Sequence, residues 1–488
     1  MTAAAITRNS ARRALAPGDP STTRRRCMSD RLVIVGGVAA GAKAAATARR
    51  RNPAANILVL QQETDVSYSS CGLPYHLAAP EEIPRSRLVA RTSETFRADG
   101  IDMRTRHRVE EIDAKQAIVT IRDLNSARRY TESYDKLLIA TGAEASRLKT
   151  AASLTAPPIV QLRTLADADH LVTCLTGVRK LVILGGGYIG LEMAEAACKL
   201  GLDVALVEMA PRVIPSFDEA VARMVEAMLR KHGVELFTGA RVVELDRGHV
   251  VLDNGVRIQT DMVLAATGVR PCTALATAAG VDLGSTGAIA VSPQMTTNVE
   301  HVYAAGDCVE SRHVLTDRPV WMPLGDVANR QGRVAGINMA GGHASFPGVL
   351  GTAIFKVFEL AVARTGLGLA EASAASFFPV RETIRMPSRA RYIRESKTLQ
   401  LHLTVDQHSG RVLGCEAVGE DAVDKTIDIM AAAIWGKLTA ADLFDLDLAY
   451  APPFSPVLAP VQAAGEVLNK AISTTRLSAE PSVSRDTP

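Results

Sequence analysis

One cysteine, Cys71, lies in a setting that favours redox chemistry over a structural role. It stands in Ser-Tyr-Ser-Ser-Cys-Gly-Leu-Pro-Tyr (67–75), where we expect it to begin a helix. A helix N-terminus lowers the pKa of a thiol and so favours the thiolate. The positions five residues away hold Val66 and His76, so the Cys-x4-Cys pair of a dithiol enzyme is missing. A lone thiolate can carry a sulfenic acid, a persulfide or a mixed disulfide.

The other cysteines are scattered along the chain without Cys-x-x-Cys spacing. This distribution favours neither a disulfide framework nor a zinc site, so we expect no metal and a reducing, cytoplasmic location. His76 could donate a hydrogen bond to Cys71, but a core or surface histidine is the alternative interpretation. The remaining thiols, interpreted as core residues, are Cys27, Cys174, Cys198, Cys272, Cys308 and Cys415.

The element expected to position this cysteine is a strand–loop–helix unit that precedes it. An apolar strand (32–35) leads into Gly-Gly-Val-Ala-Ala-Gly and a helix (42–51), and a second strand (57–60) follows. Glycines allow a tight turn and let a phosphate approach the helix N-terminus, whose free amides favour anions. Val38 replaces the middle glycine of the usual pattern, and Gln61 replaces the usual acid. The residues predicted to contact the first dinucleotide are Gly36, Gly37, Ala40, Gly41 and Gln61.

A second unit of the same kind follows about 150 residues later with a complete glycine pattern. The strand 181–184 leads into Gly-Gly-Gly-Tyr-Ile-Gly and a helix (191–200), and the strand 203–207 ends on Glu208. A carboxylate there accepts from both ribose hydroxyls and repels a 2′-phosphate, which favours NADH over NADPH. Arg212 lies nearby and could soften that preference. The predicted nicotinamide-site residues are Gly185, Gly187, Tyr188, Ile189, Gly190 and Glu208.

Three further loops indicate that the first unit binds a flavin. Two strands end in Thr-Gly turns, at 138–142 and 264–268, and a third ends in Gly-Asp at 302–307. An aspartate at the carboxyl end of a strand can hold a ribityl hydroxyl. The additional cofactor-binding residues predicted here are Thr141, Gly142, Gly268, Gly306 and Asp307. FAD at the first loop and NAD(P)H at the second is the pairing that this order of motifs indicates.

Together these motifs closely resemble the single-cysteine branch of the FAD-dependent pyridine nucleotide-disulfide oxidoreductases. The branch contains coenzyme A-disulfide reductases, NADH oxidases, NADH peroxidases and persulfide reductases, and the likeness covers about residues 31–470. Two further segments carry it, Pro-Leu-Gly-Asp-Val-Ala-Asn-Arg-Gln-Gly (323–332) and Ala-Tyr-Ala-Pro-Pro-Phe-Ser (449–455).

The resemblance implies an α/β fold with two Rossmann-like domains and a C-terminal α+β dimerisation domain. A strand at 399–405 and a helix at 421–435 fit that last domain. A homodimer is implied, in which the C-terminal domain of one subunit completes the active site of the other. The expected divisions are a leader (1–30), an FAD-binding domain (31–150 and 276–345), an NAD(P)H-binding domain (151–275), a dimerisation domain (346–470) and a disordered tail (471–488), whose disorder begins near Ser473.

The resemblance also assigns roles to single residues. Cys71 falls on the redox cysteine, and Tyr450 on a tyrosine that protonates the leaving thiolate, a role that suits a phenol. Tyr392 is the nearest match to another catalytic tyrosine, and Tyr188 falls on the residue that gates nicotinamide access. For coenzyme A, the resemblance implies a substrate site at Arg50, Ser67, Tyr68 and Ser70, of which Ser67 also lies near the flavin; Thr47 and Ser70 differ from the residue types usual in the family.

Three activities remain open from the sequence. In the first, NAD(P)H reduces FAD, which then reduces coenzyme A disulfide or a related small disulfide or persulfide at Cys71. In the second, the same site reduces oxygen or peroxide through a sulfenic acid. In the third, the chain reduces an electron-transfer protein such as a ferredoxin, which predicts a dispensable Cys71.

Length and charge set the remaining bounds. A chain of 488 residues calls for several domains, and 47% hydrophobic and 22% charged residues are usual for a soluble protein. The net charge is +3, but residues 1–27 carry six arginines and one aspartate, a net of +5, so the remainder carries −2. We therefore expect neither a nucleic-acid partner nor a membrane partner. The arginine-rich segment is expected to be disordered, as an over-extended start before Met28, a targeting segment or a native tail.

Overall fold

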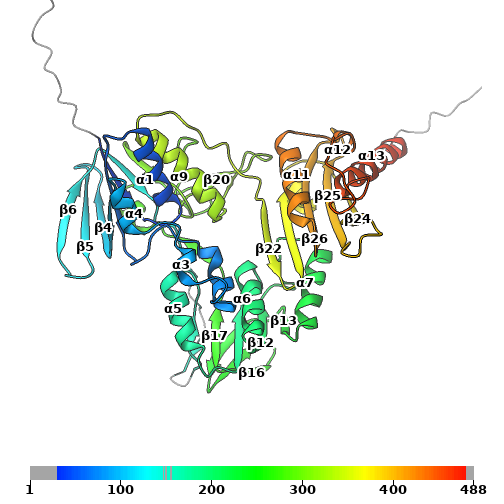
Figure 1. The fold of residues 1–488 in the computed structure, drawn as a ribbon, viewed down its shortest axis with the longest axis horizontal. Coiled ribbons are helices and arrows are strands. Elements are labelled where there is room, and N and C mark those ends of the chain that lie inside the picture. The colour runs from blue at the N-terminus through cyan, green and yellow to red at the C-terminus, as the bar shows by residue number, and fades with distance from the viewer. Residues whose placement is uncertain (1–29, 147, 149–150, 154–155, 480–488) are drawn as a thin grey trace, which may run out of the picture.

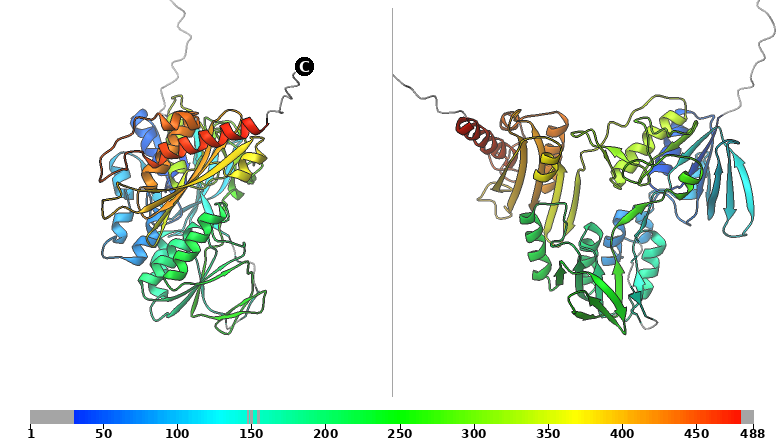
Figure 2. Two further views of the ribbon diagram at one scale, coloured as in Figure 1. Left: turned by 90° about the vertical axis from the view of Figure 1, so that its right-hand side faces the viewer. Right: turned by 180° about the vertical axis from the view of Figure 1, so that it is seen from behind.

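The computed structural model of the 488-residue chain describes residues 30–146, 148, 151–153 and 156–479. The arginine-rich segment 1–27 lies outside the described residues. Three groups of elements form a U in Figure 1: the N-terminal elements with α9 on one side, the C-terminal elements on the other, and the elements around β11 and β12 between them. The view from behind in Figure 2 shows the same arrangement.

The first group is built on a five-stranded parallel sheet. Its central strand, β1 (Arg31–Val35), has neighbours on both sides that come from different parts of the chain. Four of its five side chains are buried, as expected for a parallel strand covered on both faces. The sheet runs in the order β19 (Val302–Ala304), β7 (Lys136–Ile139), β1, β2 (Asn56–Gln61) and β3 (Asp102–Thr105).

One face of this sheet is covered by two helices that pack unusually closely. The helix α1 (Ala40–Arg51) is alanine-rich, and α9 (Gly325–Met339) presents glycines to it. A Cβ added at Gly332 would lie 2.3 Å from the Ala40 carbonyl oxygen, and one at Gly336 would lie 2.5 Å from that of Ala44. Small residues therefore let the two helix backbones approach, which explains how a core so poor in aromatics can be close-packed.

The other face of the parallel sheet packs against a smaller sheet, and several loops complete the first group. A three-stranded antiparallel sheet is formed by β4 (His107–Asp113), β5 (Ile118–Asp123) and β6 (Arg129–Ser133). Short helices and turns connect the remaining segments. They are η1 (Ser70–Gly72), α4 (Ser93–Ala98), α8 (Ala274–Ala278), and the hairpin of β20 (Ser311–Arg312) and β21 (Pro319–Val320). The short helices α2 (Leu73–Ala78) and α3 (Arg85–Leu88) come from the same stretch of chain but pack with residues of the second group, described next.

The second group repeats the parallel architecture. Its sheet has the order β10 (Ile159–Val160), β17 (Met262–Ala265), β11 (Lys180–Leu184), β12 (Asp203–Glu208) and β13 (Glu235–Thr238). The helices α5 (Leu165–Cys174), α6 (Tyr188–Lys199) and α7 (Glu219–Lys231) belong to it. A smaller sheet contains β16 (Arg257–Gln259), β15 (His249–Leu252), β14 (Val242–Asp246) and β9 (Ala151–Ala152). The strands β8 (Ala143–Ala145) and β18 (Val269–Pro271) pair antiparallel where the chain crosses between the two groups.

The third group is a five-stranded antiparallel sheet with helices on one face. The sheet order is β22 (Ala353–Val357), β23 (Leu360–Gly366), β26 (Val412–Gly419), β25 (Thr398–Asp406) and β24 (Pro379–Pro387). The helices are α10 (Leu369–Ala374), α11 (Val423–Trp435), α12 (Ala440–Phe444) and α13 (Pro460–Ala479). The α/β fold class predicted from the sequence is confirmed, as are a strand at 399–405 and a helix ending at Trp435.

The expectation of a disordered tail from Ser473 is wrong as far as Ala479, because α13 continues to that residue. The physical reason is packing against the third sheet: Leu468 and Ile472 are almost fully buried in its core. Residues 480–488 lie outside the described part of the chain. Among the described helices, none has the length and apolar character needed to cross a membrane.

Candidate active site

Both glycine-rich loops leave the carboxyl end of a central strand at the point where the strand order reverses. The chain passes from β1 to β2 on one side, and β7 pairs with β1 on the other; β11, β12 and β17 repeat this pattern. In open parallel sheets, ligands bind in the crevice outside such a switch point. The two loops are therefore in the places where dinucleotides bind.

Steric crowding shows why these loops need glycine. A Cβ at Gly41 would lie 1.8 Å from the Gly36 carbonyl oxygen, and one at Gly190 would lie 1.9 Å from that of Gly185. Gly36 and Gly185 have φ angles of +103° and +112°, a region that strains other residues. By contrast, a Cβ at Gly187 would meet nothing within 4 Å, so the protein itself leaves room there.

The residues at the ends of β2 and β12 hold their loops in the same way. The Gln61 side-chain oxygen accepts from the Gly37 amide at 2.8 Å, and a Glu208 carboxylate oxygen accepts from the Gly186 amide at 2.7 Å. The other Glu208 oxygen accepts from Ala210 N at 2.7 Å. Both side chains therefore fix the loop in addition to the ribose contact that the sequence predicts for them.

A cavity of about 550 Å³ lies over the first loop. It brings together residues from widely separated segments of the chain, among them most of the residues that the sequence predicts as flavin contacts. Cys71 opens into the same space. The predicted residues that line it are Gly36, Gly37, Ala40, Gln61, Tyr68, Ser70, Cys71, Thr141, Gly142, Gly306 and Asp307.

The environment of Cys71 differs from the sequence expectation in one respect. The residue lies in the short turn η1, immediately before α2, rather than within the first turn of an α-helix. Its pKa is raised, first by burial and then by the carboxylate of Glu192, while Arg163 lowers it. The prediction of a lowered thiol pKa is therefore wrong for the protein groups alone, because desolvation and a nearby negative charge outweigh the favourable dipole.

Arg163 is a site residue that sequence reasoning missed. It precedes α5, lines the first cavity and forms an ion pair with the Asp307 carboxylate at 2.5 Å. Its Nε donates to the Ala143 carbonyl oxygen at 3.2 Å. The signal that could have found it is an arginine just before a helix-capping Thr-x-x-Asp sequence, Thr164 to Asp167. Asp307, predicted to hold a ribityl hydroxyl, is thus itself positioned by a partly buried cation.

The residues predicted for coenzyme A are divided between the cavity and the surface. Tyr68 is buried, and its hydroxyl donates to Glu63 at 2.8 Å. Ser67 adopts a positive φ of 48°, and its amide donates to the Gly37 carbonyl oxygen. Arg50 is exposed at the end of α1 and contacts Thr47 at 3.3 Å. His76 is a core residue whose Nδ1 bonds the Ile83 carbonyl oxygen.

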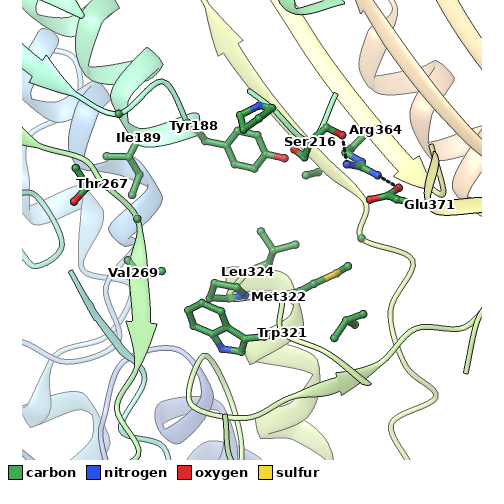
Figure 3. Close-up of a pocket in the computed structure, with 18 of the residues that line it drawn as sticks. Tyr188, Ile189, Ser216, Thr267, Val269, Trp321, Met322, Leu324, Arg364 and Glu371 are labelled. Atoms are coloured by element: carbon green, nitrogen blue, oxygen red, sulfur yellow. Dashed lines mark hydrogen bonds and ion pairs between the residues drawn. The ribbon is translucent and has the colours of Figure 1, made fainter. Parts of the chain in front are cut away.

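The second loop lines a larger cavity of about 1040 Å³, shown in Figure 3. Tyr188 stacks on Phe355 with ring centroids 4.9 Å apart, and its ring points into the space. Across the cavity lie Trp321 and Met322, from the segment after β21. Tyr188 thus stands between the loop and Phe355 of the strand β22.

Charged groups around the second loop favour a nucleotide without a 2′-phosphate. Glu208 lines the cavity with its carboxylate held by two amides. Arg212, the nearby cation, is engaged by Glu219 at 3.0 Å and Glu226 at 3.1 Å. A 2′-phosphate of NADPH would therefore meet the negative charge of Glu208. Arg212 would offer it little compensation, because its charge is already paired with Glu219 and Glu226.

The two predicted catalytic tyrosines do not lie at Cys71 within this chain. Tyr450 follows α12 and has 48% of its surface exposed, and Tyr392 has 76% exposed. Neither lines the cavity that contains Cys71. Phe454 and Val457, in the same stretch as Tyr450, are also highly exposed.

The first cavity fits FAD on its own geometry. Gly36 and Gly41 let its loop turn tightly against the protein backbone, and the cavity opens on the N-terminus of α1. Gly306, at a φ of +91°, lies close to Ala40 on the same side. The second cavity has the corresponding loop and the ribose-binding carboxylate for a nicotinamide dinucleotide. The two spaces meet near Pro323, which lines both.

Comparison with known proteins agrees with this geometry. Residues 30–332 match the family model of the pyridine nucleotide-disulphide oxidoreductases, and residues 352–461 match its dimerisation domain. The NAD(P)H sulfur oxidoreductase (CoA-dependent) of Pyrococcus abyssi is 36% identical over 429 residues, 85% of this chain and 93% of that protein. The NADH oxidase of Methanocaldococcus jannaschii is 34% identical over 86% of this chain and 95% of its own.

A solved structure extends the likeness to three dimensions. The reduced CoADR-RHD of Bacillus anthracis superposes with a TM-score of 0.89 and is 33% identical, over 91% of this chain and 81% of that one.

Proposed function

Because this chain belongs to the pyridine nucleotide-disulphide oxidoreductase family, with FAD and NAD(P)H as its cofactors, we propose that it reduces coenzyme A disulfide or a related small disulfide or persulfide at Cys71. The observation that carries this proposal is the position of Cys71. It opens into the cavity of the flavin loop, and the positions five residues away hold Val66 and His76. A single redox cysteine must form a mixed disulfide or persulfide with its substrate, because it has no local partner.

The chain's residues then have separate tasks. The Cys71 thiolate attacks one sulfur of the substrate; the substrate S–S bond breaks, and a new S–S bond forms to Cys71. The departing thiolate takes a proton, for which Tyr450 is the proposed donor. Two electrons, supplied by NAD(P)H through bound FAD, release the second thiol and restore Cys71. The balance is one disulfide, one NAD(P)H and one proton to two thiols and one NAD(P)⁺.

Substrate binding is proposed at the cavity and at the surface of α1. Ser70 and Tyr68 line the cavity next to Cys71, and Arg50 lies exposed on α1 as a partner for a phosphate. NADH is the proposed donor, because Glu208 faces the ribose position and Arg212 is neutralised by acids. A reducing compartment such as the cytoplasm would keep Cys71 able to react.

A homodimer is proposed as the active form. The match to a dimerisation domain over residues 352–461 supports it, and so does the exposed apolar stretch containing Tyr450, Phe454 and Val457. In such a dimer, Tyr450 of the second copy would reach Cys71. Tyr392 is a second tyrosine that could do so, since it is also highly exposed.

The proposal is tested by NADH consumption with coenzyme A disulfide as the acceptor, under exclusion of air. We expect two thiols released per NADH, and no release by Cys71→Ser. Cys415→Ser is a matched control, because Cys415 is buried in the third sheet, away from the cavity. Full activity of Cys71→Ser would refute a role for this thiol and would favour reduction of a protein partner.

A second candidate activity is NADH oxidation by oxygen or peroxide, with Cys71 passing through a sulfenic acid. The similarity to the NADH oxidase of Methanocaldococcus jannaschii favours it. Rapid NADH consumption in air without a disulfide, lost in Cys71→Ser, would select this activity. Mass spectrometry of Cys71 in the purified protein separates the candidates, since coenzyme A, sulfur and oxygen add different masses.

A further inference from the structure

Three aromatic rings from two groups of elements pack together beside the second cavity. Tyr188 opens α6, Phe217 lies in the loop 215–218 that leads into α7, and Phe355 lies in β22 of the third group. The Tyr188 ring stacks on Phe355 with centroids 4.9 Å apart, and Phe217 meets both rings edge-on, at 6.3 Å from Tyr188 and 6.0 Å from Phe355. Aromatic pairs of this geometry attract each other beyond the area that they bury. The third group therefore supports a side chain that lines the second cavity.

Arg364 binds the loop that carries Phe217. It is a buried residue of β23 that also lines the cavity, and its Nη1 donates to the Ser216 carbonyl oxygen. Its Nη2 forms an ion pair with Glu371 at 2.6 Å, and its guanidinium carbon lies 5.7 Å from the centre of the Phe217 ring. That distance allows a cation–π attraction. Figure 3 shows both polar contacts of Arg364 along one wall of the cavity, with the Tyr188 hydroxyl pointing toward Ser216.

The same loop is attached to the third sheet at a second point. The Asp218 amide donates to Glu416 Oε2 at 2.9 Å. Arg381 forms ion pairs with the Asp218 carboxylate at 3.1 Å and with Glu416 at 3.0 Å. The strands that carry these partners, β24 and β26, belong to the third group. Of the two arginines that hold the loop, Arg364 is the one that also lines the cavity and contacts one of the three rings.

We propose that Arg364 is a positioning residue for Tyr188, and that the dimerisation domain thereby sets how a nicotinamide dinucleotide lies at the second cavity. Arg364 fixes the loop 215–218, Phe217 of that loop contacts the Tyr188 ring, and the ring points into the cavity. The position of this ring limits where the reacting end of the dinucleotide can lie. The inference goes beyond disulfide reduction, because it concerns only the transfer of hydride from NADH to FAD.

Affinity for the dinucleotide should depend on other residues. The pyrophosphate is expected at the amides of the second loop, and the ribose at Glu208. Glu208 is held by the amides of Gly186 and Ala210, both in the second group, and none of the described contacts of Arg364 reaches either place. Alignment of the reacting atoms, in contrast, controls the rate steeply, since a misplacement of about 1 Å can cost roughly 10²-fold. Loss of Arg364 should therefore slow hydride transfer and leave NADH affinity unchanged.

The direct test follows the Tyr188 ring by ¹⁹F NMR in the FAD-containing enzyme labelled with 3-fluorotyrosine, without NADH. The Tyr188 signal is identified by its loss in Tyr188→Phe. In the wild type, the stacked Phe355 ring should shift this signal away from that of free fluorotyrosine. In Arg364→Ala we expect the signal to move toward the free value, because the ring is no longer held in one place. An unchanged Tyr188 signal would overturn the proposal.

Stopped-flow reduction of the flavin by NADH, without any disulfide, gives the second readout. We expect the limiting rate in Arg364→Ala to be about tenfold lower than in the wild type, with the NADH Kd within about twofold. An arginine that only stabilises the fold would lower Tm and leave the limiting rate of the folded enzyme unchanged, and that result would also overturn the proposal. Because Cys71 takes no part in this measurement, failure of disulfide reduction would leave the inference standing.

Arg104→Ala is the matched control. Arg104 likewise pairs with a glutamate, Glu132 at 2.7 Å, and its guanidinium carbon lies 5.9 Å from the centre of the Tyr130 ring, but it lines neither cavity. It should change neither the Tyr188 signal nor the limiting rate, and changes equal to those of Arg364→Ala would refute the assignment. Phe217→Leu breaks the same link without removing a charge, so it should reproduce both effects, and it decides the matter if Arg364→Ala does not fold.

Discussion

Substitutions at the last two glycines of the second loop should have different effects, although both glycines belong to one motif. Gly190 and Gly187 lie three residues apart. A Cβ at Gly190 would lie 1.9 Å from the Gly185 carbonyl oxygen, while a Cβ at Gly187 would meet nothing within 4 Å. Alanine at Gly190 therefore collides with the protein itself, and alanine at Gly187 can collide only with a bound dinucleotide.

The magnitude for Gly190→Ala follows from the size of the overlap. Carbon and oxygen normally stay about 3.2 Å or more apart, and the helix α6 cannot move away freely because Leu191 and Ala194 behind it are fully buried. Overpacking of this kind costs roughly 2–4 kcal/mol, at or above the usual range. For a domain of about 150–250 residues that is a fall in Tm of about 4–16 °C.

Gly187→Ala should leave Tm unchanged without nucleotide, because its φ of −83° is open to alanine. The added methyl group would instead hinder the approach of the pyrophosphate to the loop, so NADH affinity should fall about tenfold or more. Thermal unfolding by circular dichroism and NADH titration by fluorescence quenching measure the two effects. The reasoning is refuted if Gly190→Ala keeps the wild-type Tm, or if Gly187→Ala binds NADH as tightly as the wild type.

Three further predictions concern individual side chains. Arg163→Ala removes the ion pair with Asp307 and leaves a partly buried carboxylate without its cation. We therefore expect this variant to retain FAD less well than the wild type, as measured by the flavin-to-protein absorbance ratio after dialysis. FAD retention equal to that of the wild type would contradict this role of Arg163. Tyr450→Phe should slow disulfide turnover about 10²-fold while NADH still reduces the flavin at the normal rate in stopped-flow absorbance; a parallel loss of both rates would speak against a proton-donor role. Glu192 has its pKa raised from 4.5 to about 7, so the folded state binds the extra proton and its stability falls as pH rises from about 5 to 7. Glu192→Gln should remove about 2–3 kcal/mol of that fall, measured by urea unfolding at pH 5 and pH 8; identical slopes in both proteins would show that Glu192 does not cause it.

Local sequence was sufficient for the parts of the fold that short-range rules govern. The strands and helices around both glycine loops agree with expectation within a few residues, because apolar runs bounded by glycines admit few other structures. The resemblance to a family supplied the order of the domains. The tail was misjudged because Ser473 and its neighbours look polar in sequence, and their helix depends on the packing of Leu468 and Ile472 against a distant sheet.

In the candidate site too, some features could be predicted from local sequence and others depend on the tertiary structure. The residue types and spacing of the loops and of the Cys71 segment were enough to indicate a flavin, a nicotinamide nucleotide and a single redox thiol. Composition also separated the arginine-rich first residues from the slightly acidic remainder. These properties are local, since each depends on residues close together in the chain.

Only the tertiary structure decided the electrostatics of that thiol. Arg163 and Glu192 are about 90 and 120 positions away from Cys71, yet they act on it with opposite signs. The strength of each charge depends on burial and distance, which no spacing rule conveys. The sequence alone therefore determined which groups this protein uses, and the folded chain determined which distant charges act on the Cys71 thiol.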